Sequence, residues 1–170
     1  MLRFLFPTDT APDAYGYDYE KAFASGIRGI LFDIDNTLVP HDAPADRCSA
    51  ALIRRLKSMG FSVTIVSNNE EPRVREFAAL TGPAYLFRAC KPLPFGIWKA
   101  IRDMGLPKKA VLLIGDQILT DILGANLAGI RSLLVRPIDR STDTPKIRFK
   151  RKLEYPVIKM YLRWKKACNQ

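Results

Sequence analysis

The sequence predicts an α/β fold, in which a three-layer, Rossmann-like parallel sheet of about five strands has helices on both faces. Two observations support this prediction. Five short runs of apolar residues are nearly continuous, which is typical of strands that are buried on both faces. Segments with helical periodicity lie between these runs, and such an alternation implies right-handed crossovers between parallel strands.

The five apolar runs have the length of strands and are far shorter than the roughly 20 residues that span a bilayer. They occupy residues 29–34 (GILFDI), 62–66 (SVTIV), 84–87 (AYLF), 111–115 (VLLIG) and 132–135 (SLLV). The helical segments between them occupy residues 46–60, 72–82, 94–105 and 120–129. Pro72 suits a first helical position, and Gly60 and Gly82 suit helix ends.

The composition indicates one globular domain. The chain has 170 residues, 48% of them apolar, which suffices for a full hydrophobic core. Its first residues, MLRFLFPTD, hold too short an apolar stretch for a signal peptide. Three widely spaced cysteines match neither a zinc site nor a disulfide framework, so we expect a cytoplasmic protein.

The positive charge is concentrated in the C-terminal tail, residues 146–170. This tail holds nine basic side chains and one acid, a net charge of +8, whereas the rest of the chain carries +2. Three interpretations stay open: a helix docked on the domain with a solvated basic side, peripheral contact with an anionic membrane, or contact with nucleic-acid phosphates. Membrane contact would contribute up to about 1 kcal/mol per basic residue near the lipid. Nucleic acid is the least expected partner, because the sequence shows no recognisable nucleic-acid-binding fold.

Polar residues follow four of the predicted strands. In chain order they are Asp33, Asp35, Asn36 and Thr37 after the first strand, Ser67 and Asn68 after the second, Lys91 after the third, and Asp116 and Asp121 after the fourth. Parallel strands end at one edge of a sheet, where ligands bind, so we expect these side chains to share a crevice. Several carboxylates there repel one another unless a cation lies between them, and Mg²⁺ prefers such hard oxygen ligands. The pattern predicts phosphoryl transfer with magnesium, in which an aspartate is the nucleophile.

These residues also carry a family resemblance. The segments DIDNT, SNN, the lysine at position 91 and GDQILTD, in this order, resemble the four motifs of the haloacid dehalogenase (HAD) superfamily of phosphatases. The resemblance runs from about residue 27 to residue 136. More closely, GIRGILFDIDNTLVPHDAP and IGDQILTDILGANLAGI are similar to the capless YqeG-type branch of subclass IIIA. That branch is similar to phosphatases of phosphatidylglycerophosphate, an anionic lipid precursor.

The resemblance implies a role for each motif residue. Asp33 would be the nucleophile that forms an aspartyl phosphate, and Asp35 the general acid that later activates water. Lys91 would steady the phospho-aspartate. The phosphoryl group would be held by Asn36, Thr37, Ser67 and Asn68, and Mg²⁺ by Asp33, Asp35, Asp116 and Asp121, with Asp35 using its backbone carbonyl. The family's ion pumps carry threonine at the position of Asp35, so a carboxylate there favours hydrolysis over a long-lived intermediate.

Two residues near these motifs have simpler explanations. Asp121 also suits the start of a helix, where the helix dipole favours an acid, so its metal role stays open. We expect His41, the only histidine, to be a solvent-facing loop residue rather than a catalyst.

The spacing of the motifs leaves no room for a cap domain. Asp33 and Ser67 are 34 positions apart, and Ser67 and Lys91 are 24 apart. The resulting open crevice favours a large or surface-displayed phosphorylated substrate, such as phosphatidylglycerophosphate. We therefore expect an N-terminal extension (residues 1–26) that packs on a phosphatase core (residues 27–145), followed by the basic tail. The alternative is a non-catalytic protein that binds a partner or nucleic acid through this tail.

Overall fold

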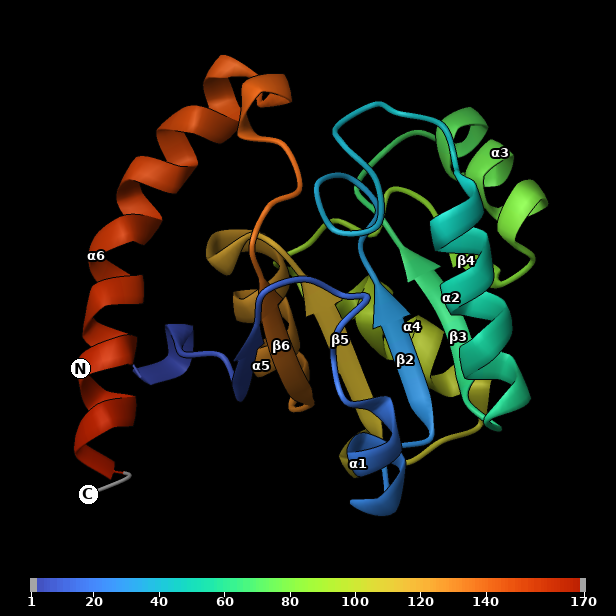
Figure 1. Ribbon diagram of the computed structural model, residues 1–170, viewed down its shortest axis with the longest axis horizontal. Coiled ribbons are helices and arrows are strands. Elements are labelled where there is room, and N and C mark those ends of the chain that lie inside the picture. The colour runs from blue at the N-terminus through green and yellow to red at the C-terminus, as the bar shows by residue number, and fades with distance from the viewer. Residues whose placement is uncertain (1–2, 169–170) are drawn as a thin grey trace.

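A sheet of six parallel strands forms the centre of the protein (Figure 1). The computed structural model describes residues 3–168; residues 1–2 of the predicted extension and 169–170 of the predicted tail lie outside the described part. The strand order is β1-β6-β5-β2-β3-β4. The strands are β1 (Asp9–Ala11), β2 (Gly29–Phe32), β3 (Ser62–Val66), β4 (Ala84–Leu86), β5 (Val111–Gly115) and β6 (Arg131–Val135). The predicted parallel α/β architecture is confirmed.

Strand β1 is the element that the sequence did not reveal. Its three residues pair in parallel with β6 at the edge of the sheet, where Asp9 lies opposite Leu133. All three are only partly buried, so this strand lacks the continuous apolar run that marked the other five. Its pairing makes the sheet one strand wider than the five that we expected.

Helices cover both faces of the sheet (Figure 1). They are α1 (Tyr19–Ala24), α2 (Arg47–Ser58), α3 (Glu71–Thr81), α4 (Phe95–Met104), α5 (Leu123–Ala128) and α6 (Pro145–Cys168), with short helical turns at Arg3–Leu5, Lys108–Ala110, Ile118–Ile122 and Arg140–Thr142. On β2, Ile30 and Phe32 pack in a cluster with residues of α1, α2 and α3, whereas Leu31 packs with residues of α4 and α5. This split follows from the strand geometry, since successive side chains point to opposite faces.

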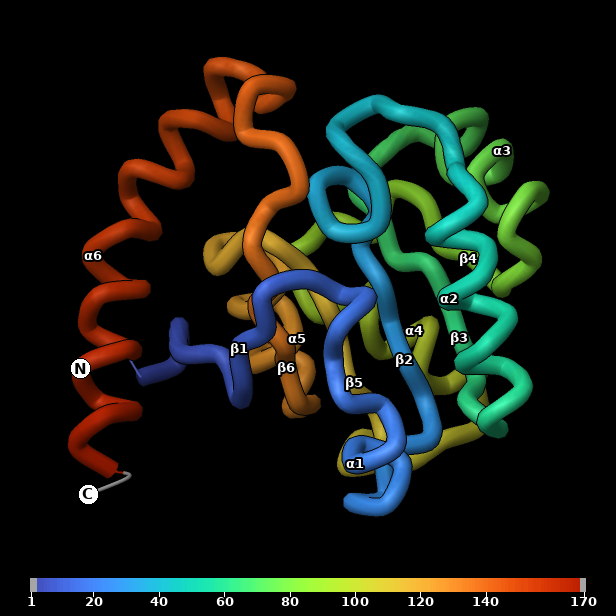
Figure 2. The backbone as a smooth tube through the Cα atoms, in the orientation of Figure 1, coloured from blue at the N-terminus to red at the C-terminus, as the bar shows by residue number. Residues whose placement is uncertain are grey.

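Helix α6 contains most of the predicted basic tail and lies beside the N-terminal segment (Figure 2). Its buried residues are Glu154, Val157 and Tyr161, which recur at helical spacing. Val157 packs in a third cluster with Leu5, from the N-terminal segment, and residues of the turn that follows β5. Among residues 3–168, no helix combines the length and the apolar composition that a bilayer span requires.

Candidate active site

The carboxyl ends of β2 and β5 bring three of the predicted aspartates together. Asp33 follows β2, Asp116 follows β5, and Asp121 lies in a π-helical turn, Ile118–Ile122. One carboxylate oxygen of each lies within 4.8 Å of the others. Strands β2 and β5 are hydrogen-bonded neighbours, so the residues after them meet at the same edge of the sheet. The three side chains that the sequence placed at this edge therefore lie together, and all three are buried.

Lys91 lies inside this group of carboxylates. Its Nζ atom is 2.7 Å from Oδ1 of Asp33 and 2.7 Å from Oδ1 of Asp121, and only 2% of its side chain is exposed. Asn68 holds the Lys91 backbone from both sides, because its amide oxygen accepts from Lys91 N (2.7 Å) and its amide nitrogen donates to Lys91 O (2.8 Å). The motif after β3 thus positions the lysine that follows β4.

The turn that carries Asp121 requires glycine at the end of β5. A Cβ atom on Gly115 would lie 2.4 Å from Cγ of Asp121, far closer than carbon atoms approach one another. Oδ2 of Asp121 also accepts the backbone N–H of Gln117 at 3.1 Å. The glycine of GDQILTD therefore allows Asp121 to fold back over the strand towards Lys91.

The three aspartates and Lys91 fit a divalent cation. Oδ1 of Asp116 is buried and has no hydrogen-bond donor among the described residues, which is costly for a carboxylate oxygen. Three carboxylates, one of them with a buried oxygen that has no partner among residues 3–168, match the hard oxygen ligands of Mg²⁺ or a similar ion. Such an ion would offset the surplus of negative charge that the three aspartates create around Lys91.

The pKa values reflect this crowding of charges. Burial raises the pKa of Asp33 to about 7, and nearby Asp121 adds to the rise although Lys91 opposes it. Burial and Asp121 also raise the pKa of Asp116 well above its usual range, although Arg151 opposes them. Burial by itself lowers the pKa of Lys91, but Asp121 and Asp33 outweigh it, so the net change is upward and the ammonium stays charged.

Arg151 belongs to this site, and our sequence analysis did not single it out. From helix α6, its Nη2 donates to Oδ2 of Asp116 at 2.5 Å, and its Nε donates to Oδ2 of Asp143 at 2.5 Å. It is one of nine basic residues in the predicted tail, and nothing in its sequence neighbourhood distinguishes it from the others. Arg151 is recognised only from the structure, in which α6 packs so that this side chain reaches Asp116.

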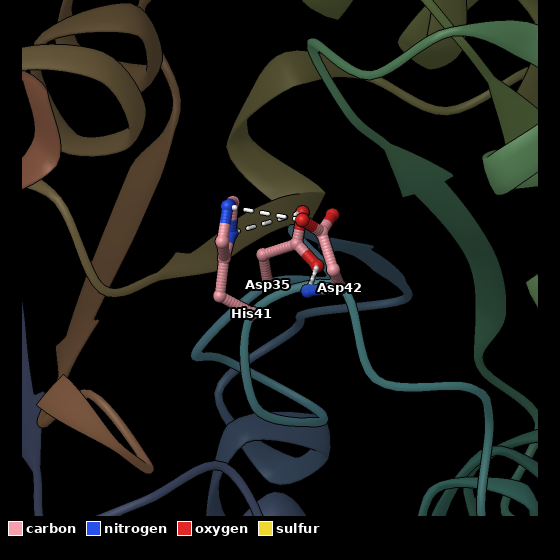
Figure 3. Close-up of side chains that lie close together, drawn as sticks. All are labelled: Asp35, His41 and Asp42. Atoms are coloured by element: carbon pink, nitrogen blue, oxygen red, sulfur yellow. Dashed lines mark hydrogen bonds and ion pairs between the residues drawn. The ribbon is translucent and has the colours of Figure 1, made fainter. Parts of the chain in front are cut away.

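The Asp35 carboxylate lies beside His41 and Asp42 of the loop after β2 (Figure 3). Its carboxylate accepts from Asn69 Nδ2 (2.5 Å), Arg73 Nη2 (3.1 Å) and Asp42 N (3.1 Å). His41 lies 3.7 Å from it through Nδ1 and 3.5 Å from Asp42 through Nε2. Only 16% of the His41 side chain is exposed, so our expectation of a solvent-facing histidine is wrong. The loop after β2 turns back on the Asp35 carboxylate, and the imidazole ring of His41 is partly buried there.

The predicted phosphate-binding residues differ in where they point. Ser67 is buried at the end of β3, and among the described residues its Oγ accepts only from the N–H of Asn69, at 3.1 Å. Oγ1 of Thr37 is buried and has no partner among residues 3–168. The Asn36 side chain, by contrast, donates to Oδ1 of Asp143 (2.9 Å) and accepts from Asp139 N (2.9 Å).

Two of these side chains, Asn36 and Asn68, have partners within the protein. The Asn36 amide ties the loop after β2 to residues 139–143, and its contact with a phosphoryl group stays a prediction. The backbone at this position has a positive φ of 59°, which asparagine tolerates better than most residues. The Asn68 amide is likewise occupied with Lys91, whose position it sets.

Comparison with known proteins agrees with this geometry. The family model described as HAD-hydrolase-like matches residues 89–150, which include Lys91, Asp116 and Asp121. The chain is also 36% identical over 161 residues to a Bacillus subtilis (strain 168) protein named "Probable phosphatase YqeG". That alignment covers 93% of this chain and 92% of the relative. The chain belongs to the YqeG-type phosphatases of the HAD superfamily. The family that the four motifs predicted is thereby confirmed.

Two further comparisons concern a second relative of this YqeG-type protein and a solved structure. A Chlamydomonas reinhardtii protein named "Phosphatidylglycerophosphate phosphatase 1, chloroplastic" is 30% identical over 158 residues, which are 87% of this chain and 59% of the relative. A solved structure titled "Structure of putative HAD superfamily (subfamily III A) hydrolase from Legionella pneumophila" aligns with a TM-score of 0.51 at 16% identity. It covers 72% of this chain and 80% of that one, and it supports the fold alone.

Proposed function

We propose that this YqeG-type protein hydrolyses phosphomonoesters with Mg²⁺ through an aspartyl phosphate on Asp33. The observation that carries the proposal is the buried pairing of Lys91 with Asp33 beside two further aspartates. Buried charges are costly, and this group keeps a net negative charge that a cation and a phosphoryl group together would balance. The site thus suits an anionic substrate that arrives with a metal.

The magnesium ion would be held by Asp33, Asp116 and the backbone carbonyl of Asp35, with Asp121 supporting them. When bound, it would withdraw charge from the phosphoryl oxygens and so make phosphorus easier to attack. The buried Oδ1 of Asp116 is the atom that supports this assignment most directly, because it otherwise lacks a partner within residues 3–168.

The chain's own residues supply the two chemical steps. A carboxylate oxygen of Asp33 forms a bond to phosphorus as the bond to the leaving oxygen breaks, and Asp35 gives that oxygen its proton. Asp35 then takes a proton from water, whose oxygen attacks phosphorus and releases Asp33 and inorganic phosphate. Arg73 and Asn69 hold the Asp35 carboxylate in a fixed orientation for both transfers. Lys91 balances the charge on the transferring group.

Residues after β3 complete the phosphoryl site. Ser67 lies at the end of β3, the strand next to β2. Its Oγ can donate to a phosphoryl oxygen, since its hydrogen bond with the N–H of Asn69 uses it as an acceptor. We assign it to the phosphoryl group. Asn68 does not contact the phosphoryl group in this proposal; it positions Lys91 by bonding its backbone.

We further propose an amphiphilic substrate, such as phosphatidylglycerophosphate, displayed at an anionic membrane. The relative from Chlamydomonas carries that substrate in its name. Helix α6 offers a matching surface, because two large apolar side chains that lie one turn apart on its outer side are exposed: Phe149 and Leu153, at 62% and 51%. Exposed basic residues follow the same helix beside them, including Lys152, Lys159 and Arg163. Apolar side chains beside basic ones are typical of helices that lie in the plane of an anionic membrane.

Phosphate release tests the chemistry. Purified protein is incubated with p-nitrophenyl phosphate, and separately with phosphatidylglycerophosphate in detergent micelles, with Mg²⁺ or with a chelator. We expect Mg²⁺-dependent release that Asp33→Asn abolishes while the variant keeps the wild-type circular dichroism spectrum. A folded wild-type protein that releases phosphate from neither compound would contradict the proposed function.

A further inference from the structure

A cavity of about 370 Å³ lies beside Asp116, between the ends of β1 and β6 and helix α6. Its apolar lining, called the apolar wall below, includes residues of β1, β6 and α6: Ala11, Leu134, Val135, Tyr155, Ile158 and Leu162. Three arginines also line it: Arg136, Arg140 and Arg151. The phosphoryl-transfer chemistry proposed above uses none of the apolar residues and neither Arg136 nor Arg140.

The arginines of this cavity are not equivalent. Arg151 is occupied by Asp116 and Asp143. Arg136 and Arg140 are exposed, and within residues 3–168 neither forms an ion pair. The lining contains one acid besides Asp116, namely Glu154, whose Oε1 already accepts the backbone N–H of Leu119 at 2.9 Å. The cavity therefore presents two uncompensated guanidinium groups next to an apolar wall.

We propose that this cavity binds the non-reacting half of the substrate, with a second phosphate at Arg136 and Arg140 and the adjoining apolar chain along the wall of Leu162 and Ile158. The inference rests on the proposed function. It names a second phosphate and an adjoining apolar chain as the features by which the protein would distinguish its substrate from other phosphomonoesters. Guanidinium groups bind phosphate oxygens in pairs, which gives both affinity and orientation.

The size of the cavity limits what it can hold. A volume of about 370 Å³ is at the lower end of the range for small-molecule sites, so it suits a glycerol phosphate with the first carbons of an acyl chain. Because Leu162 and Tyr155 are 46% and 57% exposed, the cavity is bounded by a helix side that also faces solvent. Longer chains would continue from there into the lipid beside α6.

The charge of the subsite is tested with short-chain substrates that stay monomeric, so that membrane binding plays no part. We compare Arg136→Gln/Arg140→Gln with Arg54→Gln/Arg102→Gln, which removes two exposed arginines from α2 and α4. The substrates are dihexanoyl phosphatidylglycerophosphate and p-nitrophenyl phosphate. We expect the first double variant to raise KM for the lipid about tenfold or more, as the loss of charge-assisted hydrogen bonds implies. Its kcat/KM for p-nitrophenyl phosphate should stay within about twofold of wild type, and the control should match wild type on both.

The apolar wall is tested with a matched pair on α6. Leu162 and Met160 are similarly exposed, at 46% and 43%, but only Leu162 lines the cavity. Leu162→Ser should raise KM for the dihexanoyl lipid several-fold but not for its deacylated form, which keeps both phosphates. Met160→Ser should change neither.

The outcomes separate this inference from the proposed function. If the arginine double variant handles the lipid like wild type, or loses activity equally on both substrates, the subsite is excluded while the phosphatase remains. If Leu162→Ser and Met160→Ser behave alike, the apolar wall is excluded. If folded wild-type protein hydrolyses neither substrate, the proposed function fails and the subsite fails with it.

Discussion

Arg151 donates from Nη2 to Oδ2 of Asp116 at 2.5 Å, although 35 positions separate the two residues in the chain. The same guanidinium donates to both carboxylate oxygens of Asp143, at 2.5 and 3.1 Å. Both carboxylates are almost wholly buried, so one arginine of the last helix balances two acids at the edge of the candidate metal site. The last helix and the candidate metal site are thus joined through a single side chain.

Replacing Arg151 should therefore affect stability in a metal-dependent way. Arg151→Gln leaves Asp116 and Asp143 without their cation, and breaking a buried pair in this manner costs about 3–5 kcal/mol. Mg²⁺ should recover part of the loss, because it takes over Asp116. Urea unfolding with Mg²⁺ and with a chelator measures both values, and Lys152→Gln, on the same helix but exposed, is the control. An equal loss under both conditions would show that Asp116 does not meet the metal.

Lys91 should matter for both folding and rate. In Lys91→Met, Asp33 and Asp121 lose their common partner, so we expect a lower free energy of unfolding and phosphate release reduced by about 100-fold or more. Release of phosphate from p-nitrophenyl phosphate at saturating Mg²⁺ checks the rate. Lys99→Met removes an exposed lysine of an ion pair in α4 and should change neither quantity appreciably. A Lys91→Met variant with wild-type kcat would refute the role of this lysine.

The pKa of Asp33 predicts how stability depends on pH without metal. This pKa is about 7 in the folded protein, against a usual value of 3.8, so the folded state binds a proton in this window that the unfolded state has released. The free energy of unfolding should then fall as the pH rises from about 4 to about 7. Asp33→Asn lacks this contribution, and saturating Mg²⁺ should remove it by favouring the ionised carboxylate.

Urea unfolding in chelator across this pH range compares the wild type with Asp33→Asn. The difference between their two curves isolates the contribution of Asp33. Parallel curves would mean that Asp33 titrates normally and is not crowded by its neighbours.

The outer side of α6 should bind anionic membranes in a salt-dependent way. Removing three basic residues in Lys152→Gln/Lys159→Gln/Arg163→Gln should weaken binding to phosphatidylglycerol vesicles about tenfold or more, since each contributes up to about 1 kcal/mol. Co-sedimentation with such vesicles at low and high salt measures this. The control Arg54→Gln/Arg102→Gln/Lys109→Gln removes the same charge elsewhere. Equal weakening in both variants would point to net charge and not to α6.

Much of the fold and of the site followed from the sequence because both depend on short, local patterns. Buried parallel strands are nearly continuous apolar runs, and the residues that follow them must meet at one edge. Asp33, Lys91 and Asp116 could be placed on this argument alone. Strand β1 could not, because a short edge strand that is only partly buried has no distinguishing composition.

The side chains that pair across the fold were harder to predict. Arg73 pairs with Asp35, and Arg151 pairs with Asp116. Each arginine lies on a helix that carries other basic residues, so its sequence neighbourhood does not single it out. Which arginine turns inward depends on how the helix docks. The partners of Asn36 could not be predicted for a similar reason, since they lie in residues 139–143, more than 100 positions away.

The most direct test of the account is to trap the phosphoryl group on the protein. Wild type, Asp33→Asn and Asp35→Asn are mixed with substrate and Mg²⁺, quenched in acid and analysed by peptide mass spectrometry. We predict a phosphoryl adduct on the peptide that contains Asp33, more of it in Asp35→Asn because water is no longer activated, and none in Asp33→Asn. Phosphate release by Asp33→Asn at the wild-type rate, or an adduct on another residue, would contradict the claim that Asp33 is the nucleophile.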